Sequence, residues 1–158
     1  MEALAKRLGE RLKAAGEQLV TAESCTGGWA AQLVTSVPGS SAWFERGFVT
    51  YSNAAKQELL GVGESTLKSH GAVSEETARA MAQGALARSR ATLALAITGV
   101  AGPGGGSRDK PVGMVCFAWA TRRGTRSETR AFPGDRESVR RLSVIHGLEG
   151  VLASLAGG

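Results

Sequence analysis

The sequence has few aromatic residues, only two histidines, only two cysteines and no long apolar run. A membrane-spanning helix needs about 20 apolar residues, so we expect no membrane span. Charges of both signs at the N-terminus are not typical of a secretory signal peptide. Cys25 and Cys116 lack metal-ligand spacing, which argues against a disulfide scaffold or a zinc site and indicates a reduced, cytoplasmic protein.

The shortage of histidine and of aromatic residues restricts the possible functions. His70 lies in a Ser-His-Gly turn and His146 in an apolar helical segment, so a Ser-His-Asp triad is not expected. Aromatic residues make up 5% of the chain, and the basic residues that give a net charge of +5 are scattered. Nucleic-acid surfaces combine clustered basic residues with stacking aromatics. We therefore expect no nucleic-acid partner and favour an anionic small molecule.

Helical and strand-like patterns alternate along the chain. Its 158 residues, 42% hydrophobic and 21% charged, predict a single domain over residues 1–158. Hydrophobic periodicity predicts helices at about 4–15, 29–37, 54–60, 74–88 and 135–155, and strands at about 18–22, 43–51, 92–98, 112–121 and 128–132. The last two strands are expected to be antiparallel neighbours joined around Gly124. The alternation predicts the α/β class, as a three-layer α/β/α sandwich around a mixed sheet.

The strand at 18–22 leads directly into a turn of small polar residues and glycines. A strand-to-helix turn can hold a serine at the end of a sheet, beside the free N–H groups of the helix start. Ser24 is therefore a candidate nucleophile. The alternative is that Ser24 or Thr26 is an ordinary helix N-cap.

A glycine-rich loop at residues 99–106 follows the buried strand at 92–98. It is not a P-loop, because no lysine follows a glycine at the required place, and Ser107 occupies the position of the last glycine in a dinucleotide fingerprint. The loop is nevertheless rich in N–H donors and lies at the carboxyl end of a strand, where α/β sheets bind ligands. It is either a ligand-binding loop or a plain surface loop.

Lys56 is the candidate base for a serine nucleophile. It lies in the first turn of the helix at 54–60, just after the strand that Tyr51 ends. A lysine acts as a base only if burial or neighbouring positive charge lowers its pKa. The alternative is a solvated helix lysine.

Seven motifs resemble the CinA C-terminal domain family in order and spacing. They are TAESCTGG at 21–28, GSSAWF at 39–44, GFVTYSN at 47–53, Lys56, HGAVS at 70–74, TGVAGP at 98–103 and KPVG at 110–113. The resemblance covers nearly the whole chain. It implies hydrolysis of the carboxamide of nicotinamide mononucleotide to nicotinate mononucleotide and ammonia, within pyridine nucleotide salvage. Longer relatives carry an N-terminal pyrophosphatase-like domain, and we expect only the deamidase half here.

The resemblance also implies the site residues and the partners. Ser24 is the expected nucleophile, with Tyr51 and Lys56 completing the catalytic group, and no metal or organic cofactor is expected. The expected substrate-binding residues are Thr26, Gly27, Ser40, Ser41, Thr98, Gly99, Gly102, Arg136 and Arg140. A homodimer is expected, as for the family. The competing interpretations are a non-catalytic, protein-binding module linked to competence or DNA damage, and an amidase with another substrate.

Overall fold

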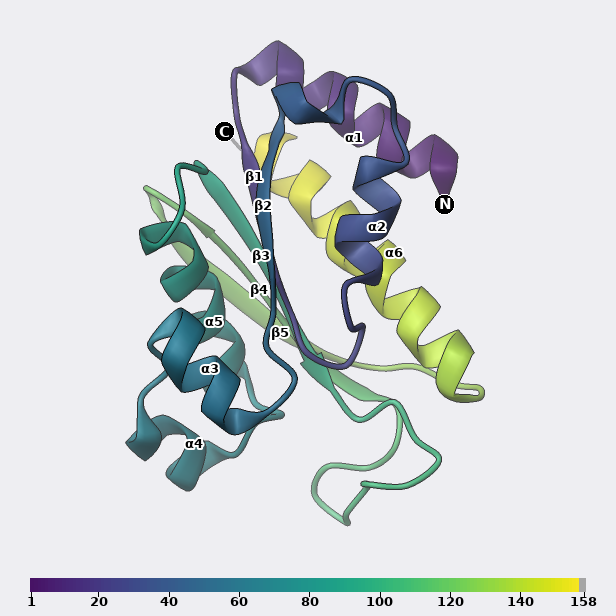
Figure 1. Cartoon of the computed structure of the whole chain (residues 1–158). Coiled ribbons are helices and arrows are strands. Elements are labelled where there is room, and N and C mark those ends of the chain that lie inside the picture. Colours follow the sequence, from purple (N-terminus) through teal and green to yellow (C-terminus); the bar gives the residue numbers. More distant parts are fainter. Residues whose placement is uncertain (157–158) are drawn as a thin grey trace.

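The protein is built around a five-stranded sheet with helices on both faces, seen in a computed structural model that describes residues 1–156 (Figure 1). The elements follow in the order α1 (Glu2–Ala15), β1 (Leu19–Glu23), α2 (Trp29–Thr35), the 3-10 turn η1 (Ser40–Ala42), β2 (Phe44–Val49), α3 (Asn53–Leu60), α4 (Glu64–His70), α5 (Glu75–Ala87), β3 (Leu93–Gly99), β4 (Met114–Thr121), β5 (Gly124–Ala131) and α6 (Arg136–Ala156). The last two residues of the predicted domain, 157 and 158, lie outside the described residues.

The sheet is mixed, in the order β2-β1-β3-β4-β5. β1 is parallel to both β2 and β3, whereas β3, β4 and β5 are antiparallel to one another in turn. The parallel strands are joined through helices, as parallel connections require. Their carboxyl ends therefore meet at one edge of the sheet, where the turn after β1 and the glycine loop after β3 lie side by side.

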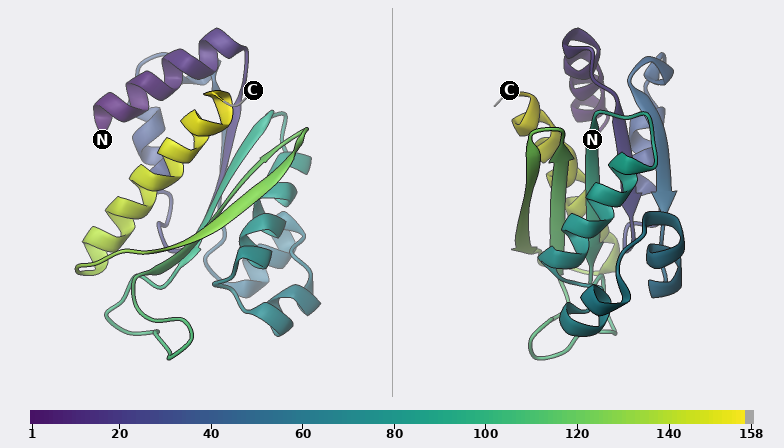
Figure 2. Two further views of the ribbon diagram at one scale, coloured as in Figure 1. Left: turned by 180° about the vertical axis from the view of Figure 1, so that it is seen from behind. Right: turned by 90° about the vertical axis from the view of Figure 1, so that its left-hand side faces the viewer.

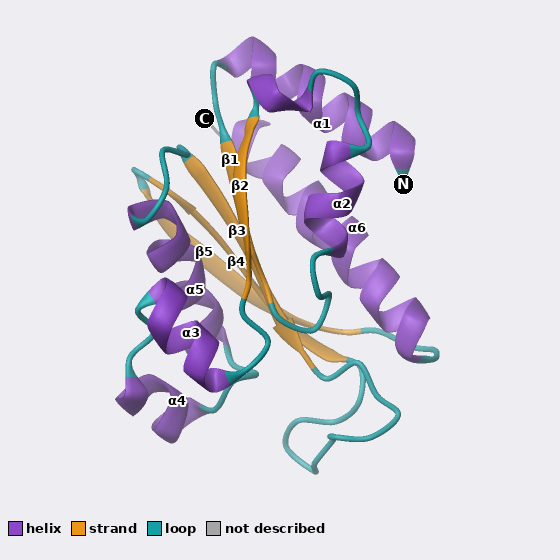
Figure 3. Cartoon of the chain, viewed as in Figure 1, coloured by secondary structure: helices purple, strands orange, loops and turns teal. Residues whose placement is uncertain are grey.

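Helices α1, α2 and α6 cover one face of the sheet, and α3, α4 and α5 cover the other (Figures 2 and 3). The strand side chains that face α1 and α6 are large, among them Leu95, Ile97 and Phe117. Those that face α5 include the small residues Ala94, Ala96, Ala118 and Ala120. Because side chains alternate between the two faces of a strand, this pattern gives α5 a flat surface to pack on. The predicted three-layer α/β/α fold is confirmed.

Local capping signals account for several helix starts. Ser52 accepts a hydrogen bond from Ala55 N–H at 3.0 Å at the start of α3. Ser74 accepts one from Thr77 N–H at 3.1 Å at the start of α5. These short polar side chains satisfy N–H groups that the helix itself leaves unpaired.

Two predictions of secondary structure need correction. Helix α4 (Glu64–His70) was not predicted, because it has only 7 residues and no side-chain cap at its start. Strand β5 begins at Gly124, four residues before the expected start at Glu128, because the whole segment pairs with β4. Within the described residues, no helix is both long and apolar enough to cross a bilayer.

Candidate active site

Ser24 begins the turn that joins β1 to α2. Its main-chain N–H donates to the carbonyl oxygen of Ile97 at 2.9 Å, which holds it at the carboxyl end of the sheet. Gly27 N–H donates back to the Ser24 carbonyl oxygen at 3.1 Å. Gly27 has a φ of 60°, a left-handed conformation that glycine adopts without strain. The nucleophile candidate is thus fixed by main-chain hydrogen bonds and is only 7% exposed.

Lys56 reaches Ser24 from helix α3. Its side chain is 1% exposed, and its Nζ lies 2.9 Å from Ser24 Oγ. The same Nζ lies 2.9 Å from the Thr50 carbonyl oxygen and 3.1 Å from the Tyr51 carbonyl oxygen. The structure therefore brings the predicted serine and lysine into direct contact.

Burial lowers the pKa of the Lys56 amine below its ordinary value, because the charged form loses its hydration. The nearby Cys25 opposes this only as a smaller effect. Among the ion pairs of residues 1–156, none involves Lys56. The site therefore favours the neutral amine more than water does, as a general base requires.

Ser24 and Lys56 line a cavity of about 270 Å³. Its other walls are residues 72–73, the glycine loop and the side chains of Tyr51 and Arg136. A larger cavity, of about 550 Å³, lies at the opposite end of the sheet, near Gly16 and Arg122. None of the described residues that line that larger cavity is a lysine or a histidine. The smaller cavity therefore combines space with a nucleophile and a base.

Thr98, Gly99 and Gly102 lie in the cavity wall, as predicted. The Thr98 hydroxyl donates to the Ala72 carbonyl oxygen at 2.8 Å, which joins β3 to the segment before α5. A Cβ on Gly99 would lie 2.7 Å from a side-chain atom of β4, so the strand end requires a glycine. Arg136 Nη1 donates to the Gly102 carbonyl oxygen at 2.7 Å. Arg136 therefore holds the loop and also faces the cavity.

The position of the Tyr51 side chain does not match the catalytic role expected for it. Tyr51 is 62% exposed, and its hydroxyl accepts a hydrogen bond from Arg136 Nη2 at 3.3 Å. The contact of Tyr51 with Lys56 is through the main-chain carbonyl oxygen. The geometry gives no support to a proton relay through the Tyr51 hydroxyl.

Thr26, Gly27 and Arg140 form the turn rather than the cavity wall. The Thr26 hydroxyl donates to Glu23 Oε1 at 2.6 Å. Arg140 donates to the carbonyl oxygens of Cys25 and Thr26. Thr26, Gly27 and Arg140 are not among the described residues that line the cavity. Direct contact of these three residues with substrate therefore has no support from the geometry.

Ser40 and Ser41 do not join the site within this chain. They lie in η1, which precedes β2. Strand β2 is parallel to β1, and its first residue pairs with the first residue of β1. Because Ser24 follows the other end of β1, the two serines lie at the amino end of these strands, a strand length away from the nucleophile.

Glu23 is a further site residue, which is not among the residues predicted from the sequence. It is fully buried at the end of β1, and its carboxylate accepts hydrogen bonds from Thr26 Oγ1 at 2.6 Å, Ala30 N at 2.8 Å and Ala31 N at 3.1 Å. The carboxylate thereby joins the turn to the start of α2. The sequence does contain a signal for this role, because Glu23 is an acidic residue at the end of a largely apolar strand.

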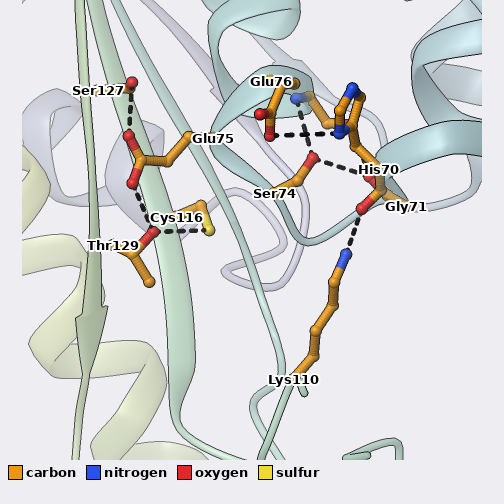
Figure 4. A network of polar contacts seen from close by, with 10 residues as sticks. His70, Gly71, Ser74, Glu75, Glu76, Lys110, Cys116, Ser127 and Thr129 are labelled. Carbon is orange, nitrogen blue, oxygen red and sulfur yellow. Dashed lines mark hydrogen bonds and ion pairs between the residues drawn. The ribbon is translucent and has the colours of Figure 1, made fainter.

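Polar contacts also join Lys110, which follows the glycine loop, to the end of α4 (Figure 4). Lys110 donates to the His70 carbonyl oxygen at the end of α4, and His70 lies 3.8 Å from the Glu76 carboxylate. Ser74 donates to the Gly71 carbonyl oxygen at 3.0 Å. These contacts fix the segment at 70–74, which supplies part of the cavity wall.

Comparison with known proteins identifies the family. The sequence model of the CinA C-terminal domain family matches residues 1–155 of the chain. The chain belongs to the CinA C-terminal domain family. The resemblance seen in the sequence motifs is thereby confirmed.

Curated CinA-family relatives cover most of the chain. The chain is 56% identical over 149 residues to nicotinamide-nucleotide amidohydrolase PncC of Escherichia coli, covering 92% of this chain and 89% of that protein. It is also 56% identical over 149 residues to the PncC of Pseudomonas putida, covering 94% of this chain and 93% of that protein. A putative competence-damage inducible protein of Symbiobacterium thermophilum is 52% identical, and the match covers 39% of its length.

Solved structures of CinA proteins share the fold. The competence/damage inducible protein CihA of Agrobacterium tumefaciens superposes with a TM-score of 0.93 at 49% identity, covering 96% of this chain and 93% of that one. A CinA superfamily protein of Klebsiella pneumoniae gives a TM-score of 0.96 at 38% identity, covering 99% of this chain and 98% of that one. The architecture described above is therefore that of the family.

Proposed function

We propose that this CinA-family protein hydrolyses the carboxamide of nicotinamide mononucleotide, giving nicotinate mononucleotide and ammonia. The names of the PncC relatives, which are 56% identical to the chain, support the substrate. The buried Ser24–Lys56 contact supports an amidohydrolase over a non-catalytic module. A binding module needs no buried lysine beside a serine hydroxyl, since desolvating an amine costs free energy.

The main support for the proposal is the set of hydrogen bonds that Lys56 can make. A neutral amine has two N–H donors and one lone pair. The Thr50 and Tyr51 carbonyl oxygens can only accept, so they take the two N–H groups. Ser24 Oγ lies 2.9 Å from Nζ, so when the amine is neutral its lone pair is left for the Ser24 hydroxyl to donate to. This arrangement satisfies the neutral amine fully and aligns the serine proton for removal.

The proposed reaction has two stages. Ser24 Oγ bonds to the carboxamide carbon while its proton passes to Lys56 Nζ. The C–N bond then breaks, and the Lys56 ammonium returns that proton to the departing nitrogen, which leaves as ammonia. Water attacks the resulting ester and gives a proton to Lys56, which returns it to Ser24 Oγ as nicotinate mononucleotide departs.

We propose that Arg136 and the glycine loop bind the nucleotide portion of the substrate. Arg136 faces the cavity, and a guanidinium suits the two oxygens of a phosphate. The loop contributes main-chain N–H groups at the carboxyl end of the sheet, a usual place for ligands in α/β folds. On this assignment the phosphate supplies binding energy away from the reacting carboxamide.

The cellular context also belongs to the proposal. A role in pyridine nucleotide salvage follows from the proposed product. The cytoplasmic location, supported by two free cysteines, and the homodimer, implied by the family resemblance, remain predictions. Size-exclusion chromatography with light scattering measures the oligomeric state.

The test is product formation by the purified protein. Wild-type protein incubated with nicotinamide mononucleotide is expected to release ammonia and nicotinate mononucleotide in equal amounts. Ser24→Ala is expected to release neither, while Arg122→Ala, changed far from the site, matches wild type. Absence of ammonia from the folded wild-type protein, or equal release by Ser24→Ala, would overturn the proposal.

A further inference from the structure

Arg140 lies behind the nucleophile turn, on helix α6. Its Nε donates to the Cys25 carbonyl oxygen at 3.1 Å, and its Nη2 donates to the Thr26 carbonyl oxygen at 3.1 Å. The guanidinium carbon also lies 5.4 Å from the centre of the Trp29 ring. The two donors of one rigid group thus bind two successive carbonyl groups of the turn, immediately after Ser24.

These contacts set the direction of the peptide N–H groups in the turn. The peptide bonds of the turn are trans, and in a planar trans peptide the C=O and the next N–H point in opposite directions. With the Thr26 carbonyl held toward Arg140, the Gly27 N–H of the same peptide group points the other way and donates to the Ser24 carbonyl oxygen. The Ser24 carbonyl accepts from Gly27 N–H, which directs the Cys25 N–H outward from the turn in the same way.

The Cys25 N–H is unusual because it lies at the cavity wall without a partner in another described residue, whereas the Thr26 N–H lies outside the described cavity lining. Cys25 is 6% exposed and Thr26 is fully buried. Within residues 1–156, no main-chain oxygen accepts a hydrogen bond from either N–H group, and neither donates to a side chain of another residue. Buried main-chain N–H groups are almost always paired, and an exception beside a nucleophile indicates a catalytic use.

A second contact holds the other side of the turn. The Glu23 carboxylate binds the Thr26 hydroxyl and the Ala30 and Ala31 N–H groups. Arg140 therefore fixes the carbonyl groups of the turn while Glu23 fixes its helix-side donors. The opposed contacts hold the turn and leave the Cys25 N–H free for a ligand.

We propose that Arg140 is a positioning residue, which holds the turn so that the Cys25 N–H stabilises the oxyanion formed when Ser24 attacks. If the Ser24–Cys25 peptide group rotated, the Ser24 carbonyl oxygen would face the developing negative charge. The proposal rests on the proposed function for its substrate. It assigns Arg140 a role other than phosphate binding, in line with the absence of Arg140 from the described cavity lining.

The test separates positioning from phosphate binding by comparing two substrates. For Arg140→Ala, kcat is expected to fall about 10²- to 10³-fold, as after loss of an oxyanion donor, while KM changes less than about threefold. The fold-loss should be the same for nicotinamide mononucleotide and nicotinamide riboside, which lacks the phosphate. Arg140→Lys should recover little, because one ammonium cannot span both carbonyls. The matched control is Arg141→Ala, an exposed neighbour on α6, which should retain wild-type kcat.

A fluorophosphonate probe tests Arg140 independently of the carboxamide substrate. Ser24 Oγ displaces fluoride from phosphorus, with its proton passing to Lys56, and the phosphoryl oxygen occupies the oxyanion position. Labelling of Arg140→Ala should be at least about tenfold slower than that of Arg141→Ala, at matched thermal stability. Equal labelling rates, or a loss of activity confined to a raised KM for the phosphorylated substrate, would overturn the positioning role. If the wild-type protein releases no ammonia while the probe labels Arg140→Ala more slowly than Arg141→Ala, only the proposed substrate is overturned.

Discussion

The choice between Ser24 and its neighbour Cys25 can be predicted quantitatively. Burial raises the pKa of the Cys25 thiol from an ordinary 9.0 to about 12, because the thiolate would lose its hydration. At a pH below both values, the thiolate fraction is therefore reduced about 10³-fold, since each tenfold change corresponds to a difference of one in pKa. The thiolate is the reactive form of cysteine, so Cys25 should be chemically inert.

Alkylation and mutagenesis measure this directly. Cys25 in the native protein should react with iodoacetamide about 10³-fold more slowly than a free thiol such as N-acetylcysteine. Cys25→Ala should retain kcat within about threefold and lose roughly 1 kcal/mol of stability, since it removes one buried sulfur from the core. Ser24→Ala should lose at least about 10³-fold in kcat. Rapid alkylation of Cys25 together with an inactive Cys25→Ala would refute the assignment of Ser24.

Three further changes are expected to separate the roles of nearby residues. Lys56→Arg carries a permanent positive charge and cannot become a base at neutral pH, so its kcat should be as low as that of Lys56→Ala, about 10²-fold or more below wild type. Tyr51→Phe should keep kcat within about threefold, because the hydroxyl contacts Arg136 and not Ser24. Glu23→Gln weakens three hydrogen bonds to a buried carboxylate and should lower the free energy of unfolding by about 1–3 kcal/mol, measured by urea denaturation.

Each of these expectations has a contrary outcome. Substantial activity in Lys56→Arg would make Lys56 a charge anchor rather than a base. An inactive, folded Tyr51→Phe would restore the catalytic role of Tyr51 that the family resemblance implies. An unchanged unfolding free energy in Glu23→Gln would show that the carboxylate charge does not stabilise the turn.

The elements around Ser24 and Lys56 could be predicted because their signals are local. The apolar strand that ends in small residues and glycines, and the Ser52 cap, depend on neighbouring positions only. Spacing also placed Lys56 in the first turn of α3. The contact between Ser24 and Lys56 joins residues far apart in sequence, and it was expected from the family resemblance and from the need for a base.

The remaining site residues could not be placed from sequence because their roles depend on the fold. Arg136 and Arg140 lie one helical turn apart and look equivalent in the sequence, yet the first lines the cavity and the second binds the nucleophile turn. Ser40 lies in a motif near other site motifs, but the parallel pairing of β1 and β2 puts it at the opposite end of the strands. Only the three-dimensional arrangement separates these cases.

The central claim is that Ser24 is activated by a neutral, buried Lys56, and the pH dependence of kcat/KM tests it most directly. Burial lowers the pKa of Lys56, so the amine becomes neutral below the ordinary lysine value of about 10.4. With nicotinamide mononucleotide as substrate, kcat/KM should rise with pH along a single basic limb and level off clearly below about pH 10. A rate that is independent of pH, or that still rises tenfold per pH unit at about pH 10, would contradict the claim.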